Sequence, residues 1–168
     1  MKKKIFAIAL IATTVAISSC SKPHSEFEGV PDASAGLNAI SENGQVNGSR
    51  VVFTQVVQLE GSQEVPAVKT ETKGIAILRV TADKVLHSKV IIQKLADGDV
   101  LRFAHIHAGA AGANGPVRIG LVATAADFGE NKELQLNDLQ YTLITKGAAY
   151  VNAHSNFSPG GIVRGQIR

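Results

Sequence analysis

The sequence predicts an all-β fold, a Greek-key sandwich or barrel of about eight short strands. From residue 49 onward the chain consists of short apolar runs rich in β-branched residues, separated by clusters of Gly, Pro, Asn and Asp. Short runs and turn clusters at such spacing are typical of sandwiches and barrels. Helix signals are nearly absent, although residues 123–128 could form one helical turn. About 120 residues is an ordinary size for one such domain.

The predicted strands alternate between apolar and polar side chains, as expected of strands buried on one face. In the third run Leu86 and Val90 share one face, whereas His87 lies on the other face beside Lys89, and we expect His87 to face solvent. Turn chemistry lies between the runs, as in Asp-Gly-Asp at 97–99. The eight predicted strands are residues 51–59, 74–80, 85–95, 100–108, 117–124, 141–146, 149–154 and 162–168.

The N-terminus has the features of a secretion signal. A cationic head with three lysines precedes an apolar run over residues 5–17. This run is shorter than the roughly 20 residues that span a bilayer, and its charged flank fits a signal peptide. Ile17-Ser18-Ser19-Cys20 then resembles the lipobox of bacterial lipoproteins. The resemblance implies that residues 1–19 are removed and that Cys20 is acylated; a plain signal peptide with a coincidental cysteine is the alternative.

Cys20 is the only cysteine in the chain. The mature domain therefore cannot form an internal disulfide, and a thiol nucleophile or a cysteine-based metal site is excluded. Loss of Lys2, Lys3 and Lys4 with the signal leaves 14 basic and 14 acidic residues. Nucleic-acid binding, which depends on a basic surface, has no support in this balance.

Residues 20–48 are predicted to be the lipidated cysteine and a flexible tether, because they are rich in Ser, Gly, Asn, Pro and Glu and show no apolar period. We expect the lipid on Cys20 to attach the protein to a membrane of the cell envelope. Ser21 stands where an aspartate retains enteric lipoproteins at the inner membrane, which favours the outer membrane, with the domain periplasmic or surface-exposed. The leaflet that holds the lipid is left open.

Three histidines are candidate metal ligands. His105 and His107 are two residues apart in a predicted strand and share a face, and His154 ends another predicted strand. If the sheet brings the strands together, three imidazoles can bind copper or zinc. Arg164, on the last predicted strand, is a candidate neighbour for an anion. Histidines near strand ends also hydrogen-bond to loop carbonyls and hold turns in place, so a structural role is the alternative for these three residues. His24 lies in the predicted tether.

Enzyme signatures are missing from the sequence. It contains no Gly-x-Ser-x-Gly elbow, phosphate loop, dinucleotide fingerprint or His-Glu-x-x-His motif. The carboxylates are scattered along the sequence, and no two of them form a recognisable acid–base pair. We therefore expect binding rather than catalysis.

Four segments of the chain resemble the CHRD domain, first named from chordin. Residues 59–66, with Glu-Gly-Ser-Gln-Glu-Val-Pro after Leu59, look like its opening strand and turn. Residues 104–117 look like its central signature, and residues 150–154 and 164–167 like its closing pair. The resemblance covers about residues 50–168 and implies an immunoglobulin-like β-barrel outside the cell. Two residues depart from the family pattern. Ala67 stands where the family often has a second proline, and Ile162 stands where the family usually has an acidic residue.

A fainter similarity links the same segments to copper–zinc superoxide dismutase. That family also has His-x-His on one strand, a later strand that ends in histidine, and Gly-Gly-x-x-Arg before the last strand. The resemblance implies that His105, His107 and His154 are copper ligands and that Arg164 guides an anion. The bridging histidine and the zinc loop have no counterpart here, and dismutase activity is not expected.

Two hypotheses follow for the domain over residues 49–168. The first is a non-enzymatic module that binds a protein, a glycan or a metal at the rim of the barrel. The second is a copper or zinc protein, with redox activity as one option, centred on His105, His107 and His154.

Overall fold

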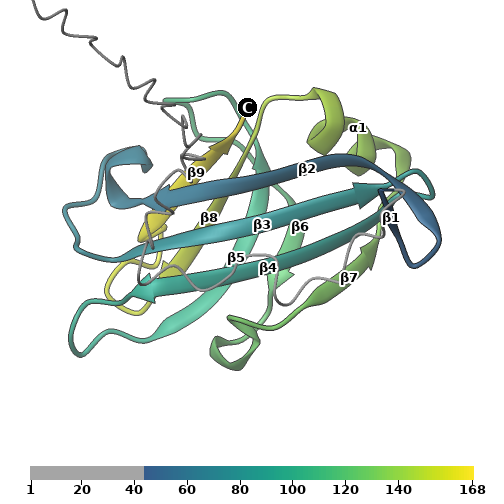
Figure 1. Cartoon of the computed structure of the whole chain (residues 1–168). Coiled ribbons are helices and arrows are strands. Elements are labelled where there is room, and N and C mark those ends of the chain that lie inside the picture. Colours follow the sequence, from purple (N-terminus) through teal and green to yellow (C-terminus); the bar gives the residue numbers. More distant parts are fainter. Residues whose placement is uncertain (1–43) are drawn as a thin grey trace, which may run out of the picture. The chain divides into compact units, whose positions relative to one another are not determined.

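Residues 44–168 are described by the computed structural model, and they form an antiparallel sheet that curls into a nearly closed barrel (Figure 1). The predicted signal peptide, Cys20, His24 and most of the predicted tether lie outside the described residues. The strands are β1 (Gln45–Val46), β2 (Ser49–Glu60), β3 (Lys73–Thr81), β4 (Val85–Lys94), β5 (Leu101–Ala108), β6 (Val117–Val122), β7 (Lys132–Gln135), β8 (Ala149–Ser155) and β9 (Val163–Ile167). The helical segments are η1 (Gly61–Gln63), η2 (Ala125–Asp127) and α1 (Asp138–Lys146).

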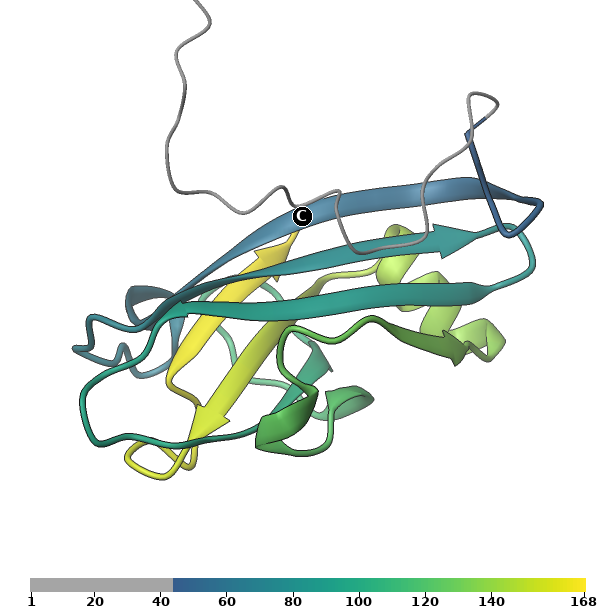
Figure 2. The ribbon, with the colours of Figure 1, turned by 60° about the horizontal axis from the view of Figure 1, so that its bottom comes forward.

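The main sheet has the order β6-β5-β8-β9-β2-β3-β4-β7, and β1 pairs only with β2. Figure 2 shows β2, β3 and β4 as one layer, with β8 and β9 running beneath them. The layers join where Glu60 of β2 pairs with Arg164 of β9. Strands β6 and β7 are the two edges. The all-β prediction is confirmed.

Alternating side chains fill the space between the layers. The buried cluster includes Leu59, Leu78 and Leu86 from one layer and Ile106 and Val151 from the other. Burying a leucine or isoleucine side chain contributes about 2–3 kcal/mol, so this interior supplies most of the driving force for folding. The opposite faces of β5, β8 and β9 thereby carry polar residues together with the aromatic rings of Phe103 and Tyr150.

One predicted strand is wrong, because residues 141–146 belong to helix α1. The residues before the run start the helix: Gln140 N–H donates to the Asn137 side chain, and Asn137 N–H donates to Gln140 Oε1. Ile144 is then the helical residue that enters the core. The β-branched and aromatic residues of the run suggested a strand, but the capping pair determines the local structure.

His87 is also a correction, since its exposed fraction is only 3%. Strand β7, which the sequence did not predict, pairs with β4 and places Glu133 opposite His87. His87 Nδ1 lies 3.1 Å from Glu133 Oε1. An imidazole that was expected in water is instead part of a polar contact at the barrel edge.

One smaller difference and one confirmation concern the segments outside the main strands. Strand β1 lies inside the stretch assigned to the tether, so the folded part begins before residue 49. The helical turn expected within residues 123–128 is present as η2. No helix among residues 44–168 is both long enough and apolar enough to span a bilayer.

Candidate metal site

The three candidate histidines lie on the face of β5 and β8 that points away from the core. The antiparallel register places His105 opposite Asn152 and His107 opposite Tyr150. Directly opposite residues point to the same side of a sheet, and the residues between them, such as Ile106 and Val151, belong to the core. His154 follows Asn152 by two residues and therefore shares this outer face.

This register brings the three imidazoles together. One ring nitrogen from each of His105, His107 and His154 lies within 4.8 Å of the others, and no other such group of three ligand side chains occurs in the described part of the chain. Nitrogens bound tetrahedrally to one ion are about 3.3 Å apart, given nitrogen–metal bonds of 2.0–2.1 Å. The rings would have to turn inward by about 1 Å to share an ion. The arrangement is therefore close to that of a metal site.

Backbone carbonyls hold two of the rings. His107 Nδ1 donates to Gly115 O at 2.8 Å, and His154 Nδ1 donates to Pro159 O at 2.9 Å. A carbonyl only accepts, so each Nδ1 carries the proton, and in the neutral ring of His107 Nε2 keeps its lone pair. His154 Nε2 lies 3.1 Å from Asn152 Oδ1, so it has to leave this contact to bind an ion. Metal-ligating histidines are commonly oriented by such bonds. His107 Nε2 and His105 Nδ1 are buried and have no hydrogen-bond partner.

Burial also favours the uncharged rings. It lowers the pKa of His105, and repulsion from His154 and His107 lowers it further. Burial likewise lowers the pKa of His154, although the bond to Pro159 acts in the opposite direction. Neutral imidazoles are the form that binds metal ions, so neither of these rings needs to lose a proton at neutral pH.

Arg164 lies on β9, beside β8, and its guanidinium group is buried against the protein rather than exposed to solvent. Its exposed fraction is 1%. Nη2 donates to Ala110 O at 3.0 Å and to Ala113 O at 2.9 Å, and the guanidinium carbon lies 3.4 Å from the centre of the Tyr150 ring. These partners satisfy the guanidinium, so the geometry favours a loop-holding role over that of an arm reaching for an anion in solvent.

The family comparison decides the class of the domain. The model of the CHRD domain matches residues 56–167. The chain belongs to the CHRD family. No curated protein and no solved structure gave a match. The CHRD match extends from within β2 to the end of β9, so it includes the three histidines, and it supports a binding module of the CHRD type.

The CHRD domain also carries a site residue that the sequence did not single out, Glu64. Its exposed fraction is 8%, and its Oε1 has no hydrogen-bond partner. Burial raises the pKa of Glu64 to about 7, although the Arg164 charge and a hydrogen bond from Asn152 lower it. Asn152 in turn places Oδ1 3.1 Å from His154 Nε2. Glu64 was missed because only the fold places its loop over β8 and β9.

Two openings lead to this outer face of the CHRD domain. A small cleft of about 200 Å³ is lined by Glu64, Arg164 and Gln166 among others. A larger one of about 510 Å³ lies beside the barrel edges and is lined by His105, Phe103 and residues of β6 and β7. His105 therefore borders the larger of the two openings.

Proposed function

We propose that this protein is a lipid-anchored, extracytoplasmic binding module of the CHRD type whose ligand is a copper or zinc ion held by His105, His107 and His154. One observation carries the proposal: the three ring nitrogens lie within 4.8 Å of one another on neighbouring strands. Two of these rings are already oriented by backbone carbonyls.

The donor set selects the kind of ion. Three imidazoles suit copper and zinc, whereas magnesium and calcium prefer oxygen ligands. Three protein ligands leave at least one coordination position for water or another ligand. His105 lines a cavity of about 510 Å³, from which such a ligand could approach.

The anchor rests on the N-terminal sequence. The cationic head, the short apolar run and Cys20 support export and acylation, and the lipid would hold the domain at the membrane, with the outer membrane favoured. A metal-binding domain in this position would meet ions that enter the envelope before they reach the cytoplasm.

The test is a calorimetric titration of the metal-free mature chain, with Cys20 replaced by Ser, using Cu²⁺ and Zn²⁺ at pH 7.5. We expect one-to-one binding that is weakened about 100-fold in His107→Gln and His154→Gln, because glutamine can still donate to the carbonyl but loses the ring nitrogen that faces the ion. His87→Gln changes a buried histidine that is not one of the three clustered ligands, so it is the matched control and should bind like the parent.

Equal affinities in the parent and the two site variants would make the histidines structural. The search would then turn to protein and glycan ligands of the barrel rim.

A further inference from the structure

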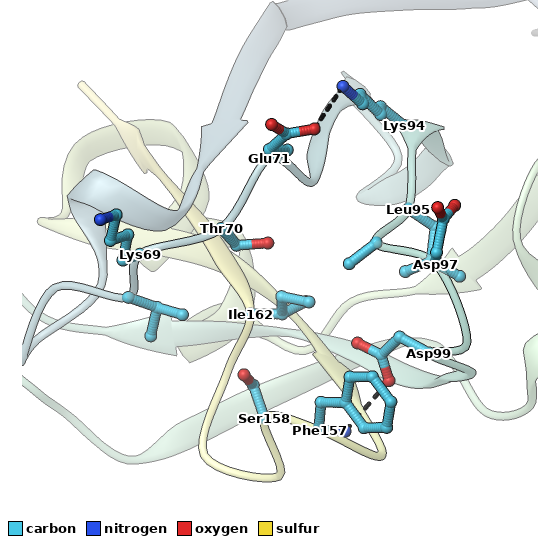
Figure 3. Close-up of a pocket in the computed structure, with 12 residues that line it drawn as sticks. Lys69, Thr70, Glu71, Lys94, Leu95, Asp97, Asp99, Phe157, Ser158 and Ile162 are labelled. Atoms are coloured by element: carbon cyan, nitrogen blue, oxygen red, sulfur yellow. Dashed lines mark hydrogen bonds and ion pairs between the residues drawn. The ribbon is translucent and has the colours of Figure 1, made fainter.

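A third pocket lies between three loops of the barrel, and none of its lining residues belongs to the histidine cluster. Its volume is about 680 Å³, within the usual range for small-molecule sites. The walls are residues 68–71, the connection from β4 to β5, and the turn from β8 to β9. Figure 3 shows the Thr70 hydroxyl, Ile162 and the Asp99 carboxylate directed inward, whereas the Lys69 ammonium points away.

Asp99 is the buried charge of this pocket. Its exposed fraction is 8%. Oδ1 accepts from Val100 N–H at 2.8 Å and from Phe157 N–H at 3.0 Å, but Oδ2 is buried without a hydrogen-bond partner. A buried acceptor without a donor is costly, and the cost is larger for a charged group. A ligand that brings a donor to Oδ2 would remove this cost.

The carboxylate is ionised at neutral pH. Burial opposes ionisation of Asp99, but the nearby Ser155 side chain and the hydrogen bonds from the backbone of Phe157 and Val100 outweigh it and lower the pKa. The nearest lysine along the chain, Lys94, pairs with Glu71 at 2.6 Å. The interior of the pocket therefore keeps a negative charge, which favours a cationic ligand.

The other walls suit a short hydrocarbon chain. Leu95, Ile162 and Val68 line the pocket, and Phe157 stands beside Asp99 with an exposed fraction of 66%. The face of an aromatic ring attracts a cation within about 6 Å. An exposed phenylalanine next to a buried carboxylate can thus contact both the charge and the carbon chain of one ligand.

We infer that this pocket binds a small molecule with a primary alkylammonium group, whose ammonium donates to Asp99 Oδ2 and whose chain packs on Ile162, Leu95 and the Phe157 ring. A charged donor makes a stronger bond to a carboxylate than a neutral hydroxyl does. A metal ion lacks ligands here, since no three carboxylate or imidazole groups converge in this part of the described chain.

The experiment uses the mature chain with Cys20 replaced by Ser, in the presence of a chelator so that the histidine cluster is metal-free. Pentylamine, pentanol and pentanoate are titrated while ¹H–¹⁵N NMR spectra are recorded. We expect saturable shifts with pentylamine at residues 97–100 and 157–158, and at least about tenfold weaker binding of pentanol and pentanoate.

The decisive variant is Asp99→Asn, which removes the charge but keeps an oxygen for the two backbone donors. Its affinity for pentylamine should fall about tenfold or more. Asp97→Asn removes a carboxylate of the same lining and should bind nearly like the parent, and Phe157→Ala should bind more weakly. Equal affinities of the parent and Asp99→Asn, with native spectra elsewhere, would overturn the inference, as would equal binding of pentanol and pentylamine.

A blocked lysine, with its α-amino and carboxyl groups capped as amides, separates two sources of the ammonium group. If it binds as tightly as pentylamine, the pocket accepts a lysine side chain. If only pentylamine binds, the ligand is a free amine. Both results support recognition of an alkylammonium group, and failure of both probes would refute it without bearing on the histidine cluster.

Discussion

The ionisation of one side chain, Glu64, can make the charge on the polar outer face of the barrel depend on pH. Its carboxyl group is buried against Arg164 and Asn152, and burial raises its pKa to about 7. The neighbouring Gly161 has φ +137°, and a Cβ there would lie 2.3 Å from Glu64 Oε1. Gly161 thus lies directly against the carboxyl group in a backbone conformation that favours glycine, and a larger residue there would collide with Glu64.

We predict that Glu64 makes the fold less stable as the pH rises. The pKa is about 7 in the folded state and near its ordinary value of 4.5 in the unfolded state. Between these values the folded state binds more protons, so this stabilisation is present below pH 4.5 and is lost as the pH rises to about 7. The loss should be about 2 kcal/mol, and Glu64→Gln should abolish it.

Urea unfolding at pH 5 and pH 8 measures this effect. The difference between the parent and Glu64→Gln isolates Glu64 from His105 and His154, whose lowered pKa values act in the opposite direction. Exposed Glu130 provides the control variant Glu130→Gln, which should behave like the parent. The same pH dependence in the parent and Glu64→Gln would show that Glu64 ionises freely.

At the scale of elements, the connection between β5 and β6 is held by the strands beneath it. Arg164 binds the carbonyls of Ala110 and Ala113, and Gln166 Nε2 donates to Gly109 O at 3.0 Å. Gly115 N–H donates to the Tyr150 hydroxyl at 3.2 Å. The carbonyl of Gly115 orients His107, so the position of this loop sets the position of one candidate ligand.

Gly115→Ala should therefore damage both the fold and the histidine cluster. The added Cβ would lie 1.6 Å from Ala108 O, which forces the loop to move. We expect a loss of about 2 kcal/mol in the free energy of unfolding and about tenfold weaker zinc binding, measured by urea unfolding and calorimetry. Gly120→Ala is the matched control, because nothing lies within 4 Å of its added Cβ. A stable variant with parental zinc affinity would contradict this account.

The same elements show how far sequence reasoning reached. Alternation and turn residues predicted most strands, and the His-x-His pair identified one face of β5 because the period of a strand is two. Helix α1 was missed because its capping pair precedes an apolar run that resembles a strand. Glu64 and Asn152 were missed because their proximity depends on the pairing of β2, β8 and β9, which no local pattern specifies.

At the scale of the whole molecule, the described domain contains no cysteine, so its stability rests on the buried cluster between the layers. The single cysteine lies far from the barrel in sequence, near the N-terminus. The proposed anchor and the proposed metal ligands therefore lie in separate parts of the chain, and each can be removed without changing the residues of the other.

Cys20→Ser should release the protein from the membrane without changing the barrel. We expect the parent to incorporate labelled palmitate and to sediment with the membrane fraction, and the variant to do neither, because a single hydroxyl cannot take the place of the thioether-linked lipid. Circular dichroism of the variant should match that of the parent. Labelled, membrane-bound Cys20→Ser protein would refute acylation at this position.

The turn between β8 and β9 has a consequence for how the family can vary. Within a few residues, Phe157 N–H binds Asp99, Pro159 O accepts from His154, and Gly161 lies against Glu64. Surface loops usually tolerate insertions, but an inserted residue here would displace all three contacts at once. Descendants of this chain should therefore keep the length of this turn, and an engineer who needs a site for a tag should place it elsewhere.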